Sequence, residues 1–182
     1  MIRLVTPSAA ATVLPLVTLK AHLRVTHAAE DAILGIYAGA AVRAIEARLG
    51  RSLGPATYSV TLGTVPPVID ITIPNVTAIA AMTIIDRDGI EQTIAEGDRL
   101  LVTGDVTSTV EPADGVTWPA AASVWNACEL TVTAGYDSGA LPPDIQAALL
   151  LMATALYRGR GDAEMPAGAA SLIAPYRIAG WM

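Results

Sequence analysis

The chain has 182 residues, 53% of them hydrophobic and 4% aromatic, and a chain of this length buries roughly 70% of its unfolded surface, so disorder is excluded. Only 15% of the residues are charged, against ~25% in average proteins, so the exposed surface is thinly charged and we expect partners to cover part of it. The net charge is −6 and the eleven basic residues are dispersed, which disfavours nucleic-acid binding through a basic face.

The first fifty residues predict two helices. Thr18 is suited to cap a short helix over residues 18–25. A longer helix is expected to begin near residues 28–30, where Glu30 and Asp31 suit the positive end of the helix dipole. It is expected to end at Gly50, which accepts the left-handed conformation common after a helix. Its expected buried stripe consists of apolar residues at three- and four-residue steps: Ile33, Ile36, Tyr37, Ala40, Ala44, Ile45 and Leu49.

From residue 55 the pattern changes to short β-branched runs separated by Pro, Gly and Asp, which favours an antiparallel sheet or small sandwich. Asp88-Gly89 predicts a hairpin turn, because glycine accepts a positive φ. Cys128 alternates with apolar residues of the last run, so we expect a buried thiol and no internal disulfide. The expected strands are residues 57–62, 68–73, 80–85, 90–94, 100–103, 106–110 and 129–133.

Helical periodicity returns near the carboxyl end. Pro143 suits the first turn of a helix that runs to about Tyr157, and a short last helix is expected over residues 169–173. The longest nearly apolar run, residues 145–157, contains Gln146 and is shorter than the ~18 residues of a membrane-spanning helix. We therefore expect no membrane span.

The helices at the two ends are separated by an all-β insertion. Because a lone amphipathic helix cannot bury its stripe, the terminal helices are expected to pack on one another. We predict an α+β fold in which residues 1–54 and 137–182 form a small helical bundle and residues 55–136 form an inserted antiparallel β module. The charge is uneven along the chain, with a net +3 for residues 1–54, −9 for residues 55–142 and zero for residues 143–182.

No constellation of catalytic or metal-binding residues is visible. His22 and His27 are five residues apart and do not share a helix face, so a local two-histidine metal site is not expected. The cluster of Asp86, Asp88 and Glu91 lacks the third acidic ligand and the bidentate glutamate of a calcium loop. The chain also has no phosphate-binding loop or dinucleotide fingerprint. We expect no enzymatic activity, no metal and no cofactor.

Several segments of the sequence resemble the corresponding segments of a known protein family. Residues 15–25 have the sequence PLVTLKAHLRV and are followed by the acidic start of the long helix. Later segments are Trp-Pro at 118–119, LTVTAGY at 130–136, PPDIQAA at 142–148 and LIAPYR at 172–177. Together they span nearly the whole chain and resemble the tailed-phage head-to-tail connector (adaptor) family, which also occurs in prophages and in gene transfer agents.

The resemblance implies a non-enzymatic structural protein that forms a ring, usually of twelve subunits, between the portal of a DNA-filled head and the stopper and tail. It implies a place at the head-tail junction of a virion or phage-like particle, after synthesis in the bacterial cytoplasm. DNA is then expected to pass through without sequence-specific binding. The alternatives are a small nucleic-acid-binding or regulatory module, which salt-dependent retention of duplex DNA would reveal, and a hydrolase.

Two surfaces are expected to serve this assembly. An acidic surface is expected to face the DNA channel or the stopper, where its repulsion would prevent tight phosphate contacts; it consists of Asp86, Asp88, Glu91, Glu96 and Asp98. The unusually apolar carboxyl end is expected either to dock on the portal or a neighbouring subunit, or to fold back on its own core. Its residues are Tyr176, Arg177, Ile178, Trp181 and Met182.

Overall fold

The chain divides into two units in a computed structural model that describes residues 1–178. The β unit contains Met1–Pro7 and Pro55–Gly135, and the helical unit contains Ser8–Gly54 and the chain from Tyr136 onward. The mixed α+β class is confirmed. Residues 1–7 differ from the expected division, because they pair with the β unit rather than packing with the helices.

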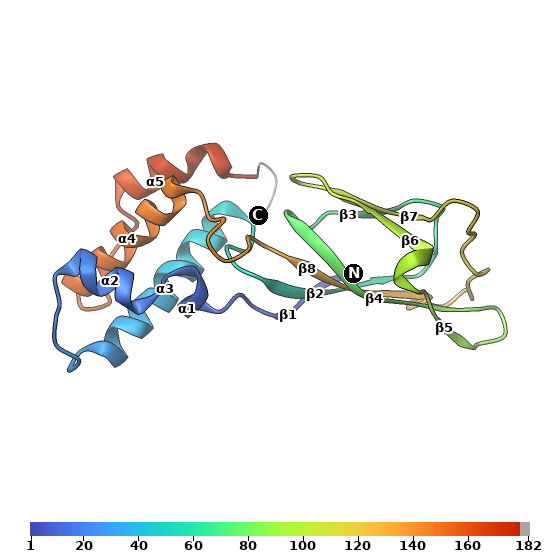
Figure 1. The fold of residues 1–182 in the computed structure, drawn as a ribbon, viewed down its shortest axis with the longest axis horizontal. Helices are drawn as coiled ribbons and strands as arrows, with labels where there is room; N and C mark the ends of the chain where they lie inside the picture. The colour runs from blue at the N-terminus through green and yellow to red at the C-terminus, as the bar shows by residue number, and fades with distance from the viewer. Residues whose placement is uncertain (179–182) are drawn as a thin grey trace. The chain divides into compact units, whose positions relative to one another are not determined.

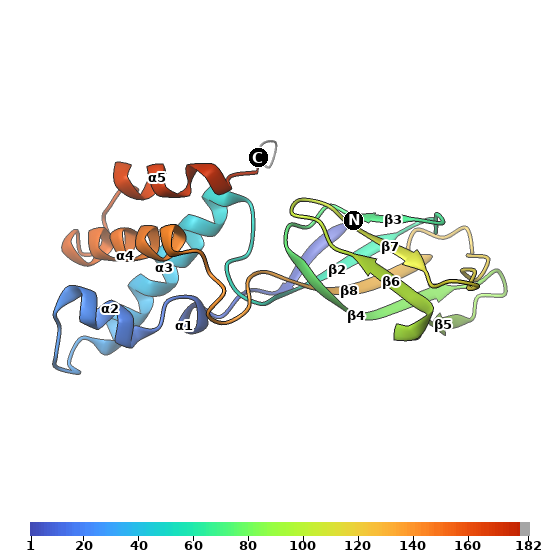
Figure 2. The same ribbon diagram turned by 45° about the horizontal axis from the view of Figure 1, so that its top comes forward.

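Strands of the β unit form two antiparallel sheets. One sheet has the order β1-β2-β8-β4-β5 and the other has the order β3-β7-β6, and Figure 2 shows both. Within the described residues the strands are β1 (Ile2–Thr6), β2 (Ala56–Leu62), β3 (Ile69–Ile71), β4 (Val76–Ile85), β5 (Glu91–Thr93), β6 (Arg99–Val102), β7 (Ser108–Pro112) and β8 (Cys128–Ala134), with a 3-10 turn, η1 (Glu96–Asp98), before β6.

The core of the β unit follows from alternation along its strands. Val60, Leu130 and Met82 lie opposite one another on β2, β8 and β4, and all three are buried. Their neighbours Ser59 and Thr131 lie opposite one another and, since successive side chains point to opposite faces, belong to the other face. The expected antiparallel sheet is confirmed, and each of the seven expected strands is present with ends shifted by a few residues.

Cys128 is buried in this core, as the alternation predicts. Burial raises the pKa of its thiol to about 11, and the nearby charge of Glu129 acts in the same direction. Because the thiolate is the reactive form, native protein at pH 7 to 8 should react with a maleimide far more slowly than protein in 6 M urea. Mass spectrometry of timed samples measures this, and equal rates in the two solvents would contradict it.

The helical unit brings the two ends of the sequence together. Helix α3 packs against α4, and α4 packs against α5, so the blue and cyan helices lie beside the orange and red ones in Figure 1. The bundle predicted from the terminal helices is thus present. The helices are α1 (Ala10–Val13), α2 (Leu16–Leu23), α3 (Asp31–Leu49), α4 (Pro143–Arg158) and α5 (Ala167–Ile173), followed by a 3-10 turn, η2 (Ala174–Tyr176).

Two details of the helices differ from the sequence prediction. Helix α2 begins after Pro15, and Thr18 lies inside it without acting as a cap. In α3 the stripe that faces the core includes Leu34, Ala38 and Val42, whereas Ile33 and Ile36 are exposed. Apolar residues of this helix lie on more than one of its sides, so three- and four-residue steps define more than one candidate buried face. Packing against the other helices decides which of these faces is buried.

A buried carboxylate, Glu46, ties together segments of the helical unit. One of its oxygens accepts hydrogen bonds from the Ser8 hydroxyl and from the backbone N–H of Leu53, the latter at 2.9 Å. The other oxygen lies 2.6 Å from Nη1 of Arg43, whose Nη2 donates to the Ser8 carbonyl at 2.9 Å. Glu46 therefore links α3 to the residues where the chain enters the unit at Ser8 and leaves it after Gly54.

Candidate assembly surfaces

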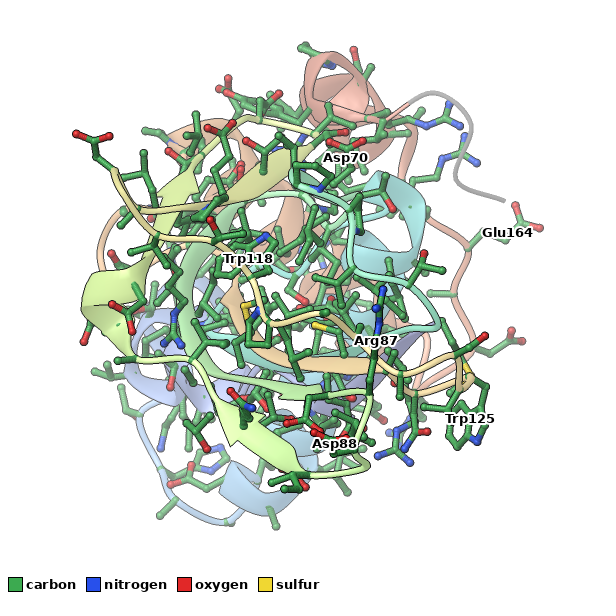
Figure 3. The ribbon with its side chains drawn as sticks, turned by 90° about the vertical axis from the view of Figure 1, so that its right-hand side faces the viewer. Asp70, Arg87, Asp88, Trp118, Trp125 and Glu164 are labelled. Atoms are coloured by element: carbon green, nitrogen blue, oxygen red, sulfur yellow. The ribbon has the colours of Figure 1, made fainter. Side chains whose placement is uncertain are left out.

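The acidic surface begins at the turn between β4 and β5. The carboxylate of Asp86 accepts hydrogen bonds from the backbone N–H groups of Asp88 and Ile90 and from the side-chain amide of Gln92. The bonds from Ile90 and Gln92, followed by that from Asp88, hold the pKa of Asp86 below its usual value. Gly89 has a φ of +80°, so the hairpin predicted at Asp88-Gly89 is confirmed. Figure 3 shows Asp88 and Arg87 at this turn.

The other expected acidic residues lie close in sequence to this hairpin. Glu91 begins β5, and Glu96 and Asp98 belong to η1. All three side chains are exposed, as is Asp88, whereas Asp86 is half-buried and organises the turn. The β unit as a whole has three basic and ten acidic residues, a net charge of −7, while the helical unit has eight basic and seven acidic residues, a net charge of +1.

The described part of the carboxyl end folds back on the helical unit. The Tyr176 hydroxyl donates to Asp144 at 3.2 Å, and the N–H of Ile178 donates to the carbonyl of Leu49 at 3.2 Å. Loss of hydration and the bond to Asp144 raise the pKa of Tyr176. Ile178 is buried and Tyr176 half-buried, whereas Arg177 is exposed. The two remaining residues of the expected docking segment, Trp181 and Met182, lie outside the described residues.

The outer face of α3 is an apolar surface that the sequence prediction assigned to the core. Ile36 is 64% exposed and Ile33 is also exposed. Ala32, Ala40 and Ala47 are exposed on the same helix. Exposed apolar side chains gathered on one side of a helix are suited to contact with another protein surface.

A loop of the β unit contains two tryptophans in contrasting surroundings. Trp118 is half-buried, and its indole N–H donates to the carbonyl of Pro67 at 3.2 Å. Trp125 is exposed, as Figure 3 shows. A large exposed aromatic side chain of this kind is typical of residues that contact a partner.

The described residues contain no arrangement that indicates catalysis or metal binding. Among residues 1–178, no group of three or more His, Cys, Asp or Glu side chains could hold a metal ion. His22 and His27 are both exposed, and His27 lies 3.9 Å from a carboxylate oxygen of Glu30. In the same range, none of the helices has the length and apolar character needed to cross a membrane.

Comparisons with known proteins decide the family. The family described as phage gp6-like head-tail connector proteins matches residues 15–103. A chain in the structure of the virion of a native gene transfer agent particle is 31% identical, over the whole of both chains, with a TM-score of 0.72. The chain belongs to the head-tail connector family. The resemblance seen in the sequence is thereby confirmed.

Two further structures match this connector over the whole of both chains. Each contains a chain that is 29% identical: the neck of an empty gene transfer agent particle computed with C6 symmetry, with a TM-score of 0.75, and the neck of a native particle computed with C12 symmetry, with a TM-score of 0.72. No curated protein shows a significant sequence match. Membership of the family makes the protein a structural connector subunit.

Two surfaces of the connector are missed by reasoning from the sequence. The signal for strand β1 is its alternating sequence with β-branched residues, IRLVT. Its partner, β2, lies more than fifty residues away, so the local sequence does not show the pairing. The exposed face of α3 is indicated by apolar residues, among them Ile33 and Ile36, that lie outside the stripe of Leu34, Ala38 and Val42.

Proposed function

We propose that this connector forms a ring in the neck of a phage or phage-like particle, at the junction of head and tail. The observation that carries the proposal is the match, over the whole of both chains and at 29% identity, to chains in particle necks computed with sixfold and twelvefold symmetry. Low charge density and the exposed apolar face of α3 support it, because such surface is suited to burial between subunits. Twelve copies is the ring number that we propose.

The partners that we propose are the portal on one side of the ring and the stopper or tail proteins on the other. DNA passes through the ring without sequence-specific contacts. The net charge of −7 on the β unit supports this passage, because carboxylates repel phosphates and give no basic face for tight binding. The same charge argues against the alternative of a nucleic-acid-binding module.

Imaging tests the ring directly. Negative-stain images and mass measurement of the purified full-length protein, and of particles that contain it, should show rings or density at the head-tail junction. Particles from which the gene is deleted should contain DNA-filled heads without attached tails. A protein that is absent from particles, or heads and tails that join without it, would overturn the proposal.

Charge reversal tests the proposed role of the acidic surface. We propose that the part of the acidic surface at the hairpin, Asp88 and Glu91, faces the channel or the stopper. Asp86 is left unchanged because it organises the turn, and Glu96 and Asp98 because they border strand β6. Changing Asp88 and Glu91 to Lys should slow DNA ejection several-fold at low salt and less at high salt, because new basic side chains attract phosphate. Changing the same two to Asn and Gln is the matched control and should leave ejection nearly unchanged. Unaltered ejection in the Lys variant would contradict the proposal.

A truncation tests whether the carboxyl end docks on the portal or a neighbouring subunit. Removing residues 179–182 leaves every described residue in place, including the buried Ile178. The truncated protein should keep the melting temperature of the full-length chain and lose most of its binding to purified portal particles. The control is Glu164→Ala, which changes an exposed side chain outside the expected docking segment and should leave binding unchanged. Full binding by the truncated protein would refute docking through these residues.

A further inference from the structure

The structure also indicates how neighbouring copies contact one another, and this inference rests on the proposed ring. In a ring with cyclic symmetry each subunit presents two different surfaces, one to each neighbour. The β unit has four strands at sheet edges, namely β1 and β5 in one sheet and β3 and β6 in the other. An unpaired strand edge is a template for pairing with another chain unless something protects it.

Two of these edges are protected. Strand β5 has three residues, Glu91–Thr93, and all three are polar and exposed. Strand β3 also has three residues, and its central Asp70 is exposed, as Figure 3 shows. Short strands with outward-facing charged or polar side chains are the usual means of preventing edge-to-edge pairing. Neither β5 nor β3 is therefore suited to an intersubunit sheet.

Strand β1 lacks this protection. All five of its residues are exposed, and Leu4 is 45% exposed. One edge of β1 pairs with β2, where Leu4 lies opposite Tyr58. The other edge of β1 is open within the described residues. Met1 and Thr61 exchange both backbone hydrogen bonds. Because such pairs alternate with unbonded ones in an antiparallel ladder, the N–H and C=O groups of Ile2 and Leu4 point toward the open edge.

Strand β6 is the second unprotected edge. Leu100 is 54% exposed and Val102 is also exposed. The backbone N–H of Ala113 donates to the carbonyl of Asp98 at 3.0 Å, so the next pair along the ladder, Arg99 opposite Pro112 of β7, is an unbonded one. The backbone groups of Arg99 and Leu101 therefore point toward the open edge. The Arg99 guanidinium itself is held by the carbonyls of Ile94 and Ile79.

Charges beside these two edges are complementary. The side chain of Arg3 on β1 is exposed, and its guanidinium forms no hydrogen bond or ion pair with the described residues. Glu96 and Asp98 lie immediately before β6, and their carboxylates are exposed and likewise without an ionic partner in that part of the chain. Opposite charges of this kind favour one partner and one orientation. Two copies of β1, or two copies of β6, would instead bring like charges together.

We propose that β1 of one copy pairs with β6 of the next copy, so that the sheets of neighbouring β units join around the ring. The pairing gives hydrogen-bond partners to the open backbone groups of both strands. In an antiparallel pair Ile2 and Leu4 lie opposite Arg99 or Leu101 of the neighbour, because these are the residues whose backbone groups point across the contact. A second copy of this chain is the occupant, because β1 and β6 are different surfaces with opposite charge, as a ring contact requires.

Disulfide trapping tests the pairing. Directly opposed hydrogen-bonded residues of antiparallel strands have Cα atoms about 5.5 Å apart, a distance that a disulfide can span. Full-length chains with one cysteine at Ile2 or Leu4 and the other at Leu101 should give a ladder of reducible oligomers in at least one of the two combinations. The natural Cys128 is buried and stays in place. The control, Leu4→Cys with Ile90→Cys, places the second thiol at the exposed hairpin and should give no ladder.

Charge exchange gives a second readout. Arg3→Glu should reduce the yield of the ladder roughly tenfold, which corresponds to about 1.4 kcal/mol, and adding Glu96→Lys with Asp98→Lys should restore it. Each sample is also imaged for rings, so that the two proposals are tested separately. Rings without a ladder, or a ladder equally strong in the control, would overturn the strand pairing and leave the ring intact. Samples with neither rings nor ladder would overturn both.

Discussion

Replacing Glu46 by alanine should lower the free energy of unfolding of the helical unit by about 3 kcal/mol, since removing one partner from a buried charged network leaves the others unsatisfied. The Ser8 hydroxyl and the Leu53 N–H lose their acceptor, and both residues are buried. For a chain of this size the melting temperature should fall by roughly 6 to 12 °C. Calorimetry gives the melting temperature, and hydrogen exchange shows where protection is lost.

Two controls separate the network from the loss of a charge. Glu46→Gln keeps the size of the side chain and an acceptor for Leu53, so it should cost clearly less than Glu46→Ala. Glu164→Ala removes a carboxylate that is exposed and labelled in Figure 3, and should change stability by less than about 0.5 kcal/mol. A Glu46→Ala variant as stable as Glu164→Ala would show that the network contributes nothing.

The strands of the β unit are predictable from sequence because their signals are local. Val60, Leu130 and Met82 alternate with polar residues, and this alternation decides which face is buried. The β4–β5 hairpin is predictable because Asp88-Gly89 meets the backbone requirement of a tight turn. The exposed acidic residues Asp88, Glu91, Glu96 and Asp98 are predictable as a group because they are close to one another in sequence.

Features that depend on distant contacts are not predictable in this way. The identity of the buried face of α3 is set by packing against α4, because both faces of the helix are apolar. Strand β1 joins the β unit through bonds to β2, and the local pattern of five residues does not identify that partner. The fold-back of the carboxyl end includes the bond between Ile178 and Leu49, residues that are far apart in the sequence.

Replacing one leucine in each core should show that the two units keep separate cores. Leu149 is fully buried in the helical core and Leu130 is 1% exposed in the β core, and the two clusters of buried residues share no member. Changing either to alanine removes buried methyl groups and leaves a cavity, which costs about 2 to 5 kcal/mol. Both variants should therefore unfold at a lower urea concentration than the unmodified chain.

Hydrogen exchange locates the damage from each substitution. In Leu149→Ala, protection should fall in α3, α4 and α5, whose side chains form the helical core, while β2, β8 and β4 keep theirs. In Leu130→Ala the pattern should be reversed, because Leu130 packs with Val60 and Met82 of the β core. The exposed Leu151→Ala on α4 is the matched control, since it removes the same atoms from a side chain 37% exposed. Equal loss of protection in both units from either substitution would mean that the chain unfolds as one cooperative block, so that the cores depend on each other despite sharing no residue.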